Sequence, residues 1–215
     1  MKPHNRNISN LFSSSSSSTF KKSHLFYEPE TKINTIFLLE SGLVRQYTIN
    51  PNGQEATIHL FRPGAYFPIL ISISGIKNRF YFESLEKSTC LQLPVESVLD
   101  FLHSNSKEAF SLLVRSTQAL DGLSKRIELT LFNNAQTKVA SLIAYLAQTF
   151  GQPVGTGYRL DTQVSHDYLT SWLGLTRETI SRQISTLKKS GLITTKKGSI
   201  LIKDLQSLEN TYLQR

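Results

Sequence analysis

Residues 173–187 read LGLTRETISRQISTL, and this stretch decides the fold of the C-terminal part of the chain. Gly174 follows a short apolar segment, and glycine is the residue that a sharp corner between two helices tolerates best. Thr176 predicts the N-cap of a second helix, because its hydroxyl can accept a hydrogen bond from a backbone N–H of the first turn. Three apolar residues follow at spacings of four and three, on one face of that helix: Ile180, Ile184 and Leu187. The pattern predicts a helix-turn-helix.

The segments on both sides extend this motif. Ser165 is a candidate cap for the first helix, and residues 168–173 predict its body, with Leu169 and Leu173 buried. After Gly191, residues 192–202 alternate like two short strands around a tip that contains Lys196 and Lys197. A basic hairpin after a helix-turn-helix predicts a winged helix-turn-helix domain.

The polar face of the second helix has the residue types that read DNA. Arginine presents a fork that matches guanine O6 and N7, and glutamate accepts from cytosine N4. Arg177, Glu178 and Arg182 lie in the first two turns, where a recognition helix meets base edges. The alternative is that these three residues form i,i+4 salt bridges on a solvated helix. The predicted DNA-binding residues are Arg177, Glu178, Arg182, Thr176, Thr179, Ser181, Ser165, Lys196 and Lys197.

The distribution of charge agrees with a polyanionic partner. The formal net charge is +8, and residues 25–150 contribute none of it, with 11 basic and 11 acidic side chains. Residues 151–215 hold nine basic against five acidic side chains. A neutral body joined to a basic C-terminal module favours a sensing or dimerising domain attached to a double-stranded DNA binder.

Short strand-like segments and turns fill residues 35–93. Asn52-Gly53 supplies the positive φ that a hairpin needs. Residues 56–61 alternate, which predicts Ala56, Ile58 and Leu60 on one face of a strand. The apolar run 66–73 belongs to the same β-rich region. Short strands separated by regular turns predict an antiparallel barrel or roll.

After Pro94 the period becomes helical. Residues 107–131 carry an apolar seam at helical spacing: Leu113, Leu120, Leu123, Ile127 and Leu131. A long helix with such a seam pairs most economically with its own copy, which predicts a homodimer. The alternative is that the helix packs on its own β-domain. Residues 136–150 predict a second amphipathic helix, and residues 153–157 a linker.

The N-terminal residues 1–23 contain the run Ser13 to Ser18 and show no periodicity, so we expect a disordered, Ser-rich tail. The predicted domains are this tail, a β-roll sensor over residues 24–104, a dimerisation helix over 105–133 and a winged helix-turn-helix over 134–215.

Several protein classes find no support in the sequence. Cys90 is the single cysteine, and the five histidines lack metal-ligand spacing, so we expect no metal and no iron–sulfur cluster. Neither a signal peptide nor a membrane span is predicted, which favours a cytoplasmic protein without membrane contact. No nucleophile–base set or phosphate-binding glycine loop is present, so we predict no catalytic residues and no enzyme activity.

Residues 173–182, LGLTRETISR, resemble the helix-turn-helix of the Crp–Fnr family of transcription regulators. Residues 38–44, 52–55 and 61–64 (LLESGLV, NGQE and FRPG) resemble the glycine framework of that family's β-roll. The resemblance covers about residues 30–205. It implies an α+β fold with an N-terminal roll like the jelly roll of cyclic-nucleotide-binding domains, a long central dimerisation helix and a C-terminal winged helix-turn-helix. It further implies a homodimer on a palindromic operator, base contacts by Arg177, Glu178 and Arg182, a phosphate contact near Ser165, and RNA polymerase as a partner.

The sequence departs from the cyclic-nucleotide-binding members of the family. Pro68-Ile69 stands where they have Gly-Glu, and Arg79 is followed by Phe80 rather than by a hydroxyl residue. A cyclic phosphate needs a cation and backbone N–H donors, and proline donates none. We therefore expect no cyclic nucleotide and no other cofactor. An unidentified small-molecule effector remains open, with Ile58, His59, Ile69 and Arg79 as the candidate pocket, and haem on Cys90 or His59 as a less favoured reading.

Two functions thus compete. The first is a sequence-specific transcription regulator. The second is a cyclic-nucleotide-like module that acts through protein contacts and carries a vestigial DNA domain, which the retained Arg177, Glu178 and Arg182 argue against.

Overall fold

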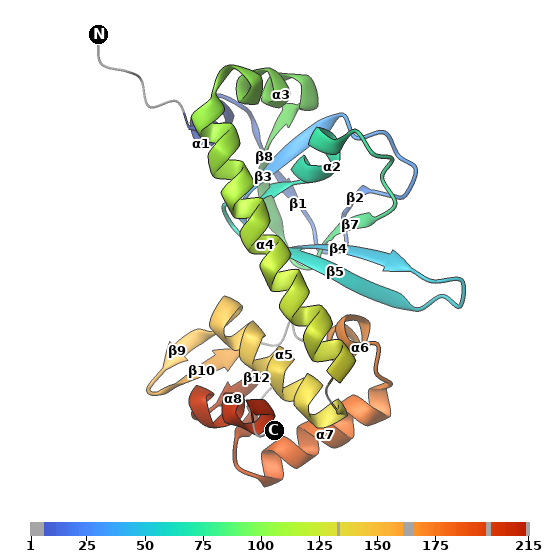
Figure 1. Cartoon of the computed structure of the whole chain (residues 1–215), viewed down its shortest axis with the longest axis vertical. Coiled ribbons are helices and arrows are strands. Elements are labelled where there is room, and N and C mark those ends of the chain that lie inside the picture. The colour runs from blue at the N-terminus through green and yellow to red at the C-terminus, as the bar shows by residue number, and fades with distance from the viewer. Residues whose placement is uncertain (1–6, 133, 161–165, 197–198, 214–215) are drawn as a thin grey trace. The chain divides into compact units, whose positions relative to one another are not determined.

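The computed structural model describes residues 7–132, 134–160, 166–196 and 199–213, with side chains for all of these except 125, 126, 129, 130, 132, 166–168 and 211–213. The chain divides into two compact units, one ending at Ala119 and the other beginning at Leu120 (Figure 1). The first unit contains a β-roll, and the second contains helices around a small sheet.

Two antiparallel sheets form the predicted roll. In the described part of the chain their strand orders are β1-β8-β3-β6 and β2-β7-β4-β5. The strands are β1 (Ser17–Phe20), β2 (Leu25–Tyr27), β3 (Thr35–Ser41), β4 (Val44–Ile49), β5 (Glu55–Phe61), β6 (Tyr66–Phe67), β7 (Tyr81–Ser84) and β8 (Ser88–Pro94). The predicted reversal at Asn52-Gly53 is confirmed: it joins β4 to β5, and Gly53 has a φ of +77°.

Gly42, between β3 and β4, shows why the roll needs its glycine framework. Its φ is +95°, which residues with a Cβ rarely adopt. A Cβ at this position would lie 2.3 Å from Oγ of Ser88, far inside van der Waals contact. Two independent constraints therefore exclude any side chain here.

The expected alternation of faces along β5 is wrong. The register between β4 and β5 shifts at a bulge that leaves Ile58 unpaired. A bulge inserts one extra residue and so reverses the faces beyond it. As a result Thr57 and Leu60 are the buried residues of the strand, and His59 is exposed.

The apolar run 66–73 is not a single strand. It forms β6 and then α2 (Ile69–Ser74), which ends at Gly75 with a φ of +65°. Ile69 and Ile71 are buried in the roll, whereas Leu70 and Ile73 are about half exposed. A short apolar run does not distinguish a strand from a helix by period alone, which is why the sequence misleads here.

The predicted disorder of residues 1–23 is wrong where the structure describes them. α1 (Ile8–Phe12) begins after Asn7, whose side chain accepts a hydrogen bond from the Asn10 N–H at 2.9 Å. Ile8 and Phe12 are buried, and the serines at the end of the run enter β1, which pairs with β8. The prediction of disorder failed for two reasons. The apolar residues before the serine run share one helix face, and an edge strand tolerates the polar side chains of the serines.

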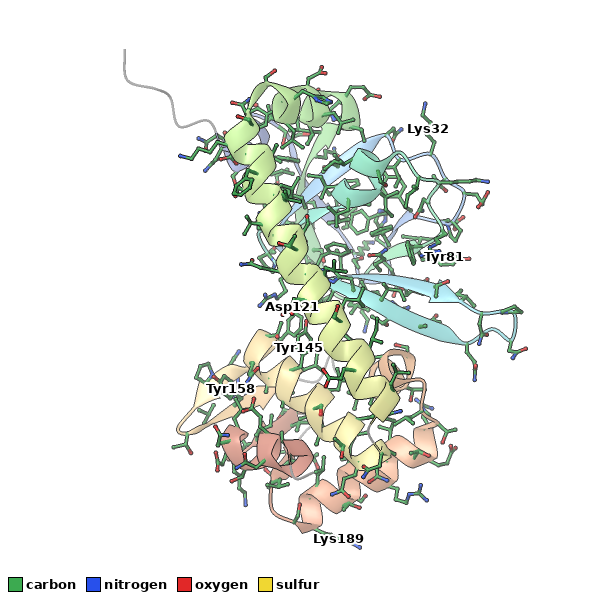
Figure 2. All side chains as sticks on the ribbon, in the orientation of Figure 1. Lys32, Tyr81, Asp121, Tyr145, Tyr158 and Lys189 are labelled. Carbon is green, nitrogen blue, oxygen red and sulfur yellow. The ribbon has the colours of Figure 1, made fainter. Side chains whose placement is uncertain are left out.

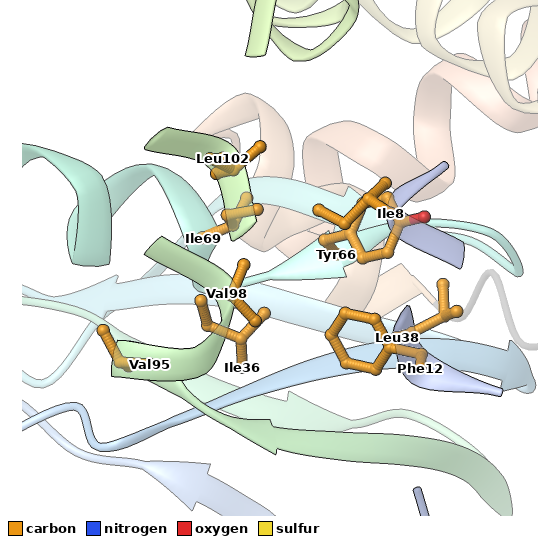
Figure 3. Packing of buried hydrophobic residues seen from close by; sticks show 9 residues of the cluster. All are labelled: Ile8, Phe12, Ile36, Leu38, Tyr66, Ile69, Val95, Val98 and Leu102. Atoms are coloured by element: carbon orange, nitrogen blue, oxygen red, sulfur yellow. The ribbon is translucent and has the colours of Figure 1, made fainter. Parts of the chain in front are cut away.

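Two apolar clusters fill the first unit. One joins α1, the sheet of β3 and β6, α2 and α3, and Figure 3 shows its members: Ile8, Phe12, Ile36, Leu38, Tyr66, Ile69, Val95, Val98 and Leu102. The other is largely aromatic and lies between the sheets, with Phe67 and Phe82 almost completely buried. The ring centroids of Phe37 and Phe67 are 5.3 Å apart and stacked.

α3 (Val95–Ser104) leads into α4 (Ser106–Phe132), the long helix predicted for residues 107–131. The first turns of α4 pack on the roll through Ala109 and Leu112, and Arg115 donates a hydrogen bond to the Gly64 carbonyl at 3.0 Å. The apolar seam lies elsewhere on the helix and is exposed. No helix among the described residues is long and apolar enough to cross a membrane.

After the end of α4 the second unit continues with α5 (Ala135–Phe150), which confirms the predicted second helix. The expected linker at residues 153–157 is wrong, because β9 (Gln152–Val154) and β10 (Gly157–Leu160) form a hairpin there. β10 pairs with the wing, giving the strand order β11-β12-β10-β9. The remaining elements are α6 (His166–Leu173), α7 (Arg177–Lys189), β11 (Ile193–Lys196), β12 (Ser199–Ile202) and α8 (Leu205–Leu213).

Candidate nucleic-acid interface

The corner between α6 and α7 is made by Gly174. Its φ is +64°, and its N–H donates to the Thr170 carbonyl at 2.9 Å to close α6. An added Cβ would meet nothing within 4 Å, so the backbone conformation alone requires glycine. Thr176 caps α7 as predicted, its hydroxyl accepting from the Thr179 N–H at 3.3 Å.

Burial fixes which face of α7 is outward. The predicted apolar face is confirmed, with Ile180 and Leu187 fully buried and Ile184 nearly so. From α6, Leu169 is buried as predicted, but Trp172 takes the place expected of Leu173, which is only half-buried. α6 and α7 also lie in contact with each other.

The opposite face of α7 carries the predicted base-reading residues. Arg177, Glu178 and Arg182 are exposed, while Thr179 and Ser181 are half-buried at the edges of that face. In the described part of the chain no ion pair joins Glu178 to Arg182. The alternative of an i,i+4 salt bridge between these two residues therefore has no support in the geometry.

The start of α7 holds Glu178 in its charged form. Its own backbone N–H and the Thr176 hydroxyl donate to the carboxylate and, with Arg177 nearby, lower its pKa below the ordinary value. The positive end of the helix dipole acts in the same direction. Glu178 is thus an ionised hydrogen-bond acceptor at neutral pH, as a cytosine contact requires.

The wing confirms its predicted strands and is partly described. β11 and β12 pair from Ile193 opposite Ile202 to Lys196 opposite Ser199. The Lys196 side chain is exposed at the end of β11. Lys197 and Ser165, two further predicted DNA-binding residues, lie outside the described residues.

Two lysines at the other end of α7 were missed by the sequence reasoning. Lys188 and Lys189 occupy the last turn and are exposed, and Figure 2 shows Lys189 directed away from the ribbon. Cations at this end of a helix also offset its dipole, so their position has an ordinary structural cause. Their place directly after the buried Leu187 is the signal that could have drawn attention to them.

The candidate effector residues are not brought together as one site. Ile69 belongs to the apolar cluster around α1 and α3, and Ile58 is half-buried on β5. His59 and Arg79 are exposed, each against a neighbouring ring: His59 against Phe61, with centroids 4.7 Å apart, and the Arg79 guanidinium over Phe80 at 5.1 Å.

Cys90 does not suit haem ligation. Its side chain is fully buried on β8, and burial, with a smaller contribution from Glu40, raises the pKa of the thiol to about 12. The thiolate is the form that binds metals, and it is absent at neutral pH. His59 lies on a strand of the other sheet.

Comparisons with known proteins agree with this division of the chain. Residues 18–105 match the model of the cyclic nucleotide-binding domain, and residues 137–211 match that of the Crp-like helix-turn-helix domain. The global nitrogen regulator of Synechocystis is 26% identical over 203 residues, which cover 90% of this chain and 87% of that protein. The regulatory protein HlyX of Actinobacillus pleuropneumoniae is 24% identical over 188 residues, covering 87% and 78%.

Solved structures show the same fold. FixK2 from Bradyrhizobium japonicum superposes with a TM-score of 0.78 at 19% identity, covering 91% of this chain and 96% of that chain. A mutant of CooA from Carboxydothermus hydrogenoformans superposes with a TM-score of 0.73 at 25% identity. The match covers 94% of this chain and 89% of that chain.

Roll, long helix and winged helix-turn-helix, in this order, define a transcription regulator with a DNA-binding domain. The chain belongs to the Crp/Fnr family, whose regulators bind DNA through this helix-turn-helix and act as dimers.

Proposed function

We propose that two copies of this chain bind a two-fold symmetric DNA site, with α7 of each copy in the major groove. The observation that carries the proposal is the outward face of α7, where Glu178 and Arg182 are exposed and not paired with each other while the opposite face is buried. The arginine guanidinium and the ionised Glu178 carboxylate are solvated on the free protein surface. Each forms a specific charge-assisted hydrogen bond when a complementary base edge meets it.

Arg177, Glu178 and Arg182 are the proposed base contacts, and Ser181 and Thr179 flank them. Thr176 contributes first as the cap that positions the helix start. Lys196, with Lys197 and Ser165 from the sequence, is the proposed phosphate contact. Phosphate contacts fix the register of the domain on the duplex and supply affinity without reading sequence.

The second copy is proposed to pair through α4. Several large apolar side chains of this helix are between two fifths and two thirds exposed: Phe110, Leu113, Val114, Leu120, Leu123, Ile127 and Leu131. Leu113, Leu120 and Ile127 recur every seven residues, the period of a two-helix coiled coil. Pairing would place two recognition helices on one operator and so account for palindromic sites.

The proposed mode of action needs neither an enzyme activity nor a cyclic nucleotide. A bound operator regulates transcription by recruiting or excluding RNA polymerase, which is the proposed third partner in the cytoplasm. The roll interior is packed with aromatic rings where a phosphate and ribose would require donors and acceptors. The roll therefore acts in this proposal as a packed body, with no cofactor inside it.

Selection of bound sequences from a random DNA pool, followed by binding assays on the selected site, tests the function. Arg182→Ala or Glu178→Ala should weaken binding to the selected site by roughly 1–3 kcal/mol and leave binding to random DNA nearly unchanged. Lys196→Ala is the matched control, and it should weaken binding to all sequences alike. It should also lower the slope of the logarithm of the binding constant against the logarithm of the salt concentration by about one.

Equal losses on selected and random DNA for Arg182→Ala and Glu178→Ala would contradict base reading. Failure to enrich any sequence would overturn the proposed function and would favour a module that acts through protein contacts.

A further inference from the structure

A cavity of about 370 Å³ lies where α1 meets β6 and the first turns of α4, entirely within the first unit. Its size falls at the small end of ligand sites, which span about 300–1,000 Å³. Six polar residues of its lining matter chemically: Ser9, Tyr66, Lys107, Glu108, Ser111 and Arg115. None of the four candidate effector residues of the roll lines it.

Three of these residues form a stripe along α4. Lys107, Ser111 and Arg115 are spaced four residues apart, which puts them on one face of the helix. The two cations are therefore about 12 Å apart along the helix axis at 1.5 Å per residue, and their flexible side chains can converge on one molecule between them. Both cations are exposed.

The hydrogen-bond donors of this stripe are not used up. Among the described residues neither the Lys107 ammonium nor the Ser111 hydroxyl has a hydrogen-bond or ion-pair partner. Other hydroxyl residues of α4 behave differently: Ser116 and Ser124 donate to carbonyls of their own helix at 2.8 and 3.0 Å. Arg115 uses one N–H on the Gly64 carbonyl and lies over the Tyr66 ring at 5.3 Å, which leaves further guanidinium donors.

Three polar groups of the lining already have partners within the chain. Glu108 accepts from the Ile8 N–H at 3.2 Å, and the Ser9 and Tyr66 hydroxyls bond to each other at 2.8 Å. The two cations outnumber the single carboxylate. The described lining thus has an excess of positive charge.

We propose that this cavity binds a small organic anion through a carboxylate or phosphate group held between Lys107 and Arg115, with Ser111 as a further donor. Charge-assisted bonds to an oxyanion would satisfy all three groups at once. The site is separate from the roll interior and from α7, so it does not depend on the proposed DNA contacts.

Calorimetric titration of the full chain with citrate and with inorganic phosphate, at constant ionic strength, tests the proposal. We expect saturable binding of one of them with a dissociation constant below about 1 mM, and the stronger of the two identifies carboxylate or phosphate as the preferred group. Lys107→Gln and Ser111→Ala should each weaken that binding, the lysine variant about tenfold or more. Thermal melts of the exposed Lys107→Gln variant check that it stays folded.

A matched control makes the result decisive. Lys87→Gln removes an exposed lysine from another part of the same unit and should leave the binding unchanged. Saturation by neither anion would overturn the site. So would an equal loss in Lys87→Gln and Lys107→Gln, because it would mean that the anions respond to net charge only.

Discussion

The roll interior and the outer face of α4 both carry large apolar side chains, but those of the roll are buried and those of α4 are exposed. Phe67 and Phe82 are at most 1% exposed, whereas Leu120 and Leu131 are 61% and 69% exposed. Side chains that the chain buries by itself hold the fold together. A regular apolar stripe that the folded chain leaves in water gains stability only when another molecule covers it, at about 25 cal/mol per Å² of apolar surface.

The polar residues within the stripe fit this distinction. Thr117 and Ser124 lie seven residues apart on α4, and each donates its hydroxyl to a carbonyl of its own helix, at 2.8 and 3.0 Å. A hydroxyl satisfied in this way can be covered by a partner helix without leaving an unpaired polar group. The stripe is therefore ready to be buried along its length.

The largest effect is expected from a charge in the stripe. Leu120→Glu or Ile127→Glu would place a carboxylate from each copy into the proposed dimer interface, at several kcal/mol per buried ion. The dimer should dissociate at micromolar concentrations, and the isolated chain should stay folded because both positions are exposed. Light scattering with circular dichroism measures both properties.

Leu70→Glu is the control for this experiment, since Leu70 is a half-exposed leucine on α2 outside the stripe, and it should leave the dimer intact. If both stripe variants remain dimeric, the comparison between the two regions fails and α4 is not the dimer contact.

A smaller effect, on folding rather than assembly, is expected from the N-terminal segment. Phe12 is fully buried, and its ring lies against Tyr66 with the centroids 5.5 Å apart. Phe12→Ala should lower the free energy of unfolding by about 3–5 kcal/mol, measured by urea denaturation at fixed protein concentration. Deletion of residues 1–18 should destabilise at least as much, because it also removes part of β1.

Leu70→Ala serves as the matched truncation of an exposed side chain and should change stability by less than about 1 kcal/mol. Full stability after the deletion would restore the view of residues 1–18 as a tail that the fold does not need.

The same contrast explains what the sequence could and could not predict. The cap at Thr176, the buried Ile180 and the exposed Arg182 follow from periodicity on one helix, which is a local property. The pairing of the serine run with β8 depends on a partner strand far along the chain. The bulge at Ile58 and the β9–β10 hairpin depend on the register and pairing of neighbouring strands. The hydrophobic pattern alone fixes neither the partner of a strand nor its register, so the predictions for these three segments were wrong.

The candidate effector residues differ in burial, which the sequence pattern does not predict. The family resemblance suggests Ile58, Ile69 and Arg79 as lining of one pocket. Packing decides which of these side chains face inward. The helix α2 directs Ile69 into the cluster around α3, while Arg79 remains at the surface. Among the described residues, Lys107 and Ser111 on α4 line a cavity and have no hydrogen-bond or ion-pair partner.

The smallest expected effect is the response to cyclic nucleotides, which should be absent. Pro68 has no backbone N–H to offer a phosphate, and Ile69 stands where a carboxylate would hold the ribose hydroxyl. The interior that a nucleotide would enter is occupied by Phe67 and Phe82, and emptying it would sacrifice stacked rings that stabilise the roll. Loss of two charge-assisted contacts, at about 1.5–3 kcal/mol each, moves a micromolar affinity towards millimolar.

Calorimetric titration of cyclic AMP and cyclic GMP into the full chain, with thermal melts alongside, should show neither saturable binding nor a shift of the melting temperature. Arg79 is the cation proposed to rescue phosphate binding, and its exposed guanidinium lies over the Phe80 ring at 5.1 Å. A dissociation constant below about 10 μM that Arg79→Ala abolishes would therefore contradict the prediction. It would mean that the aromatic interior opens for a ligand, and that the roll and the stripe of α4 differ less than their burial indicates.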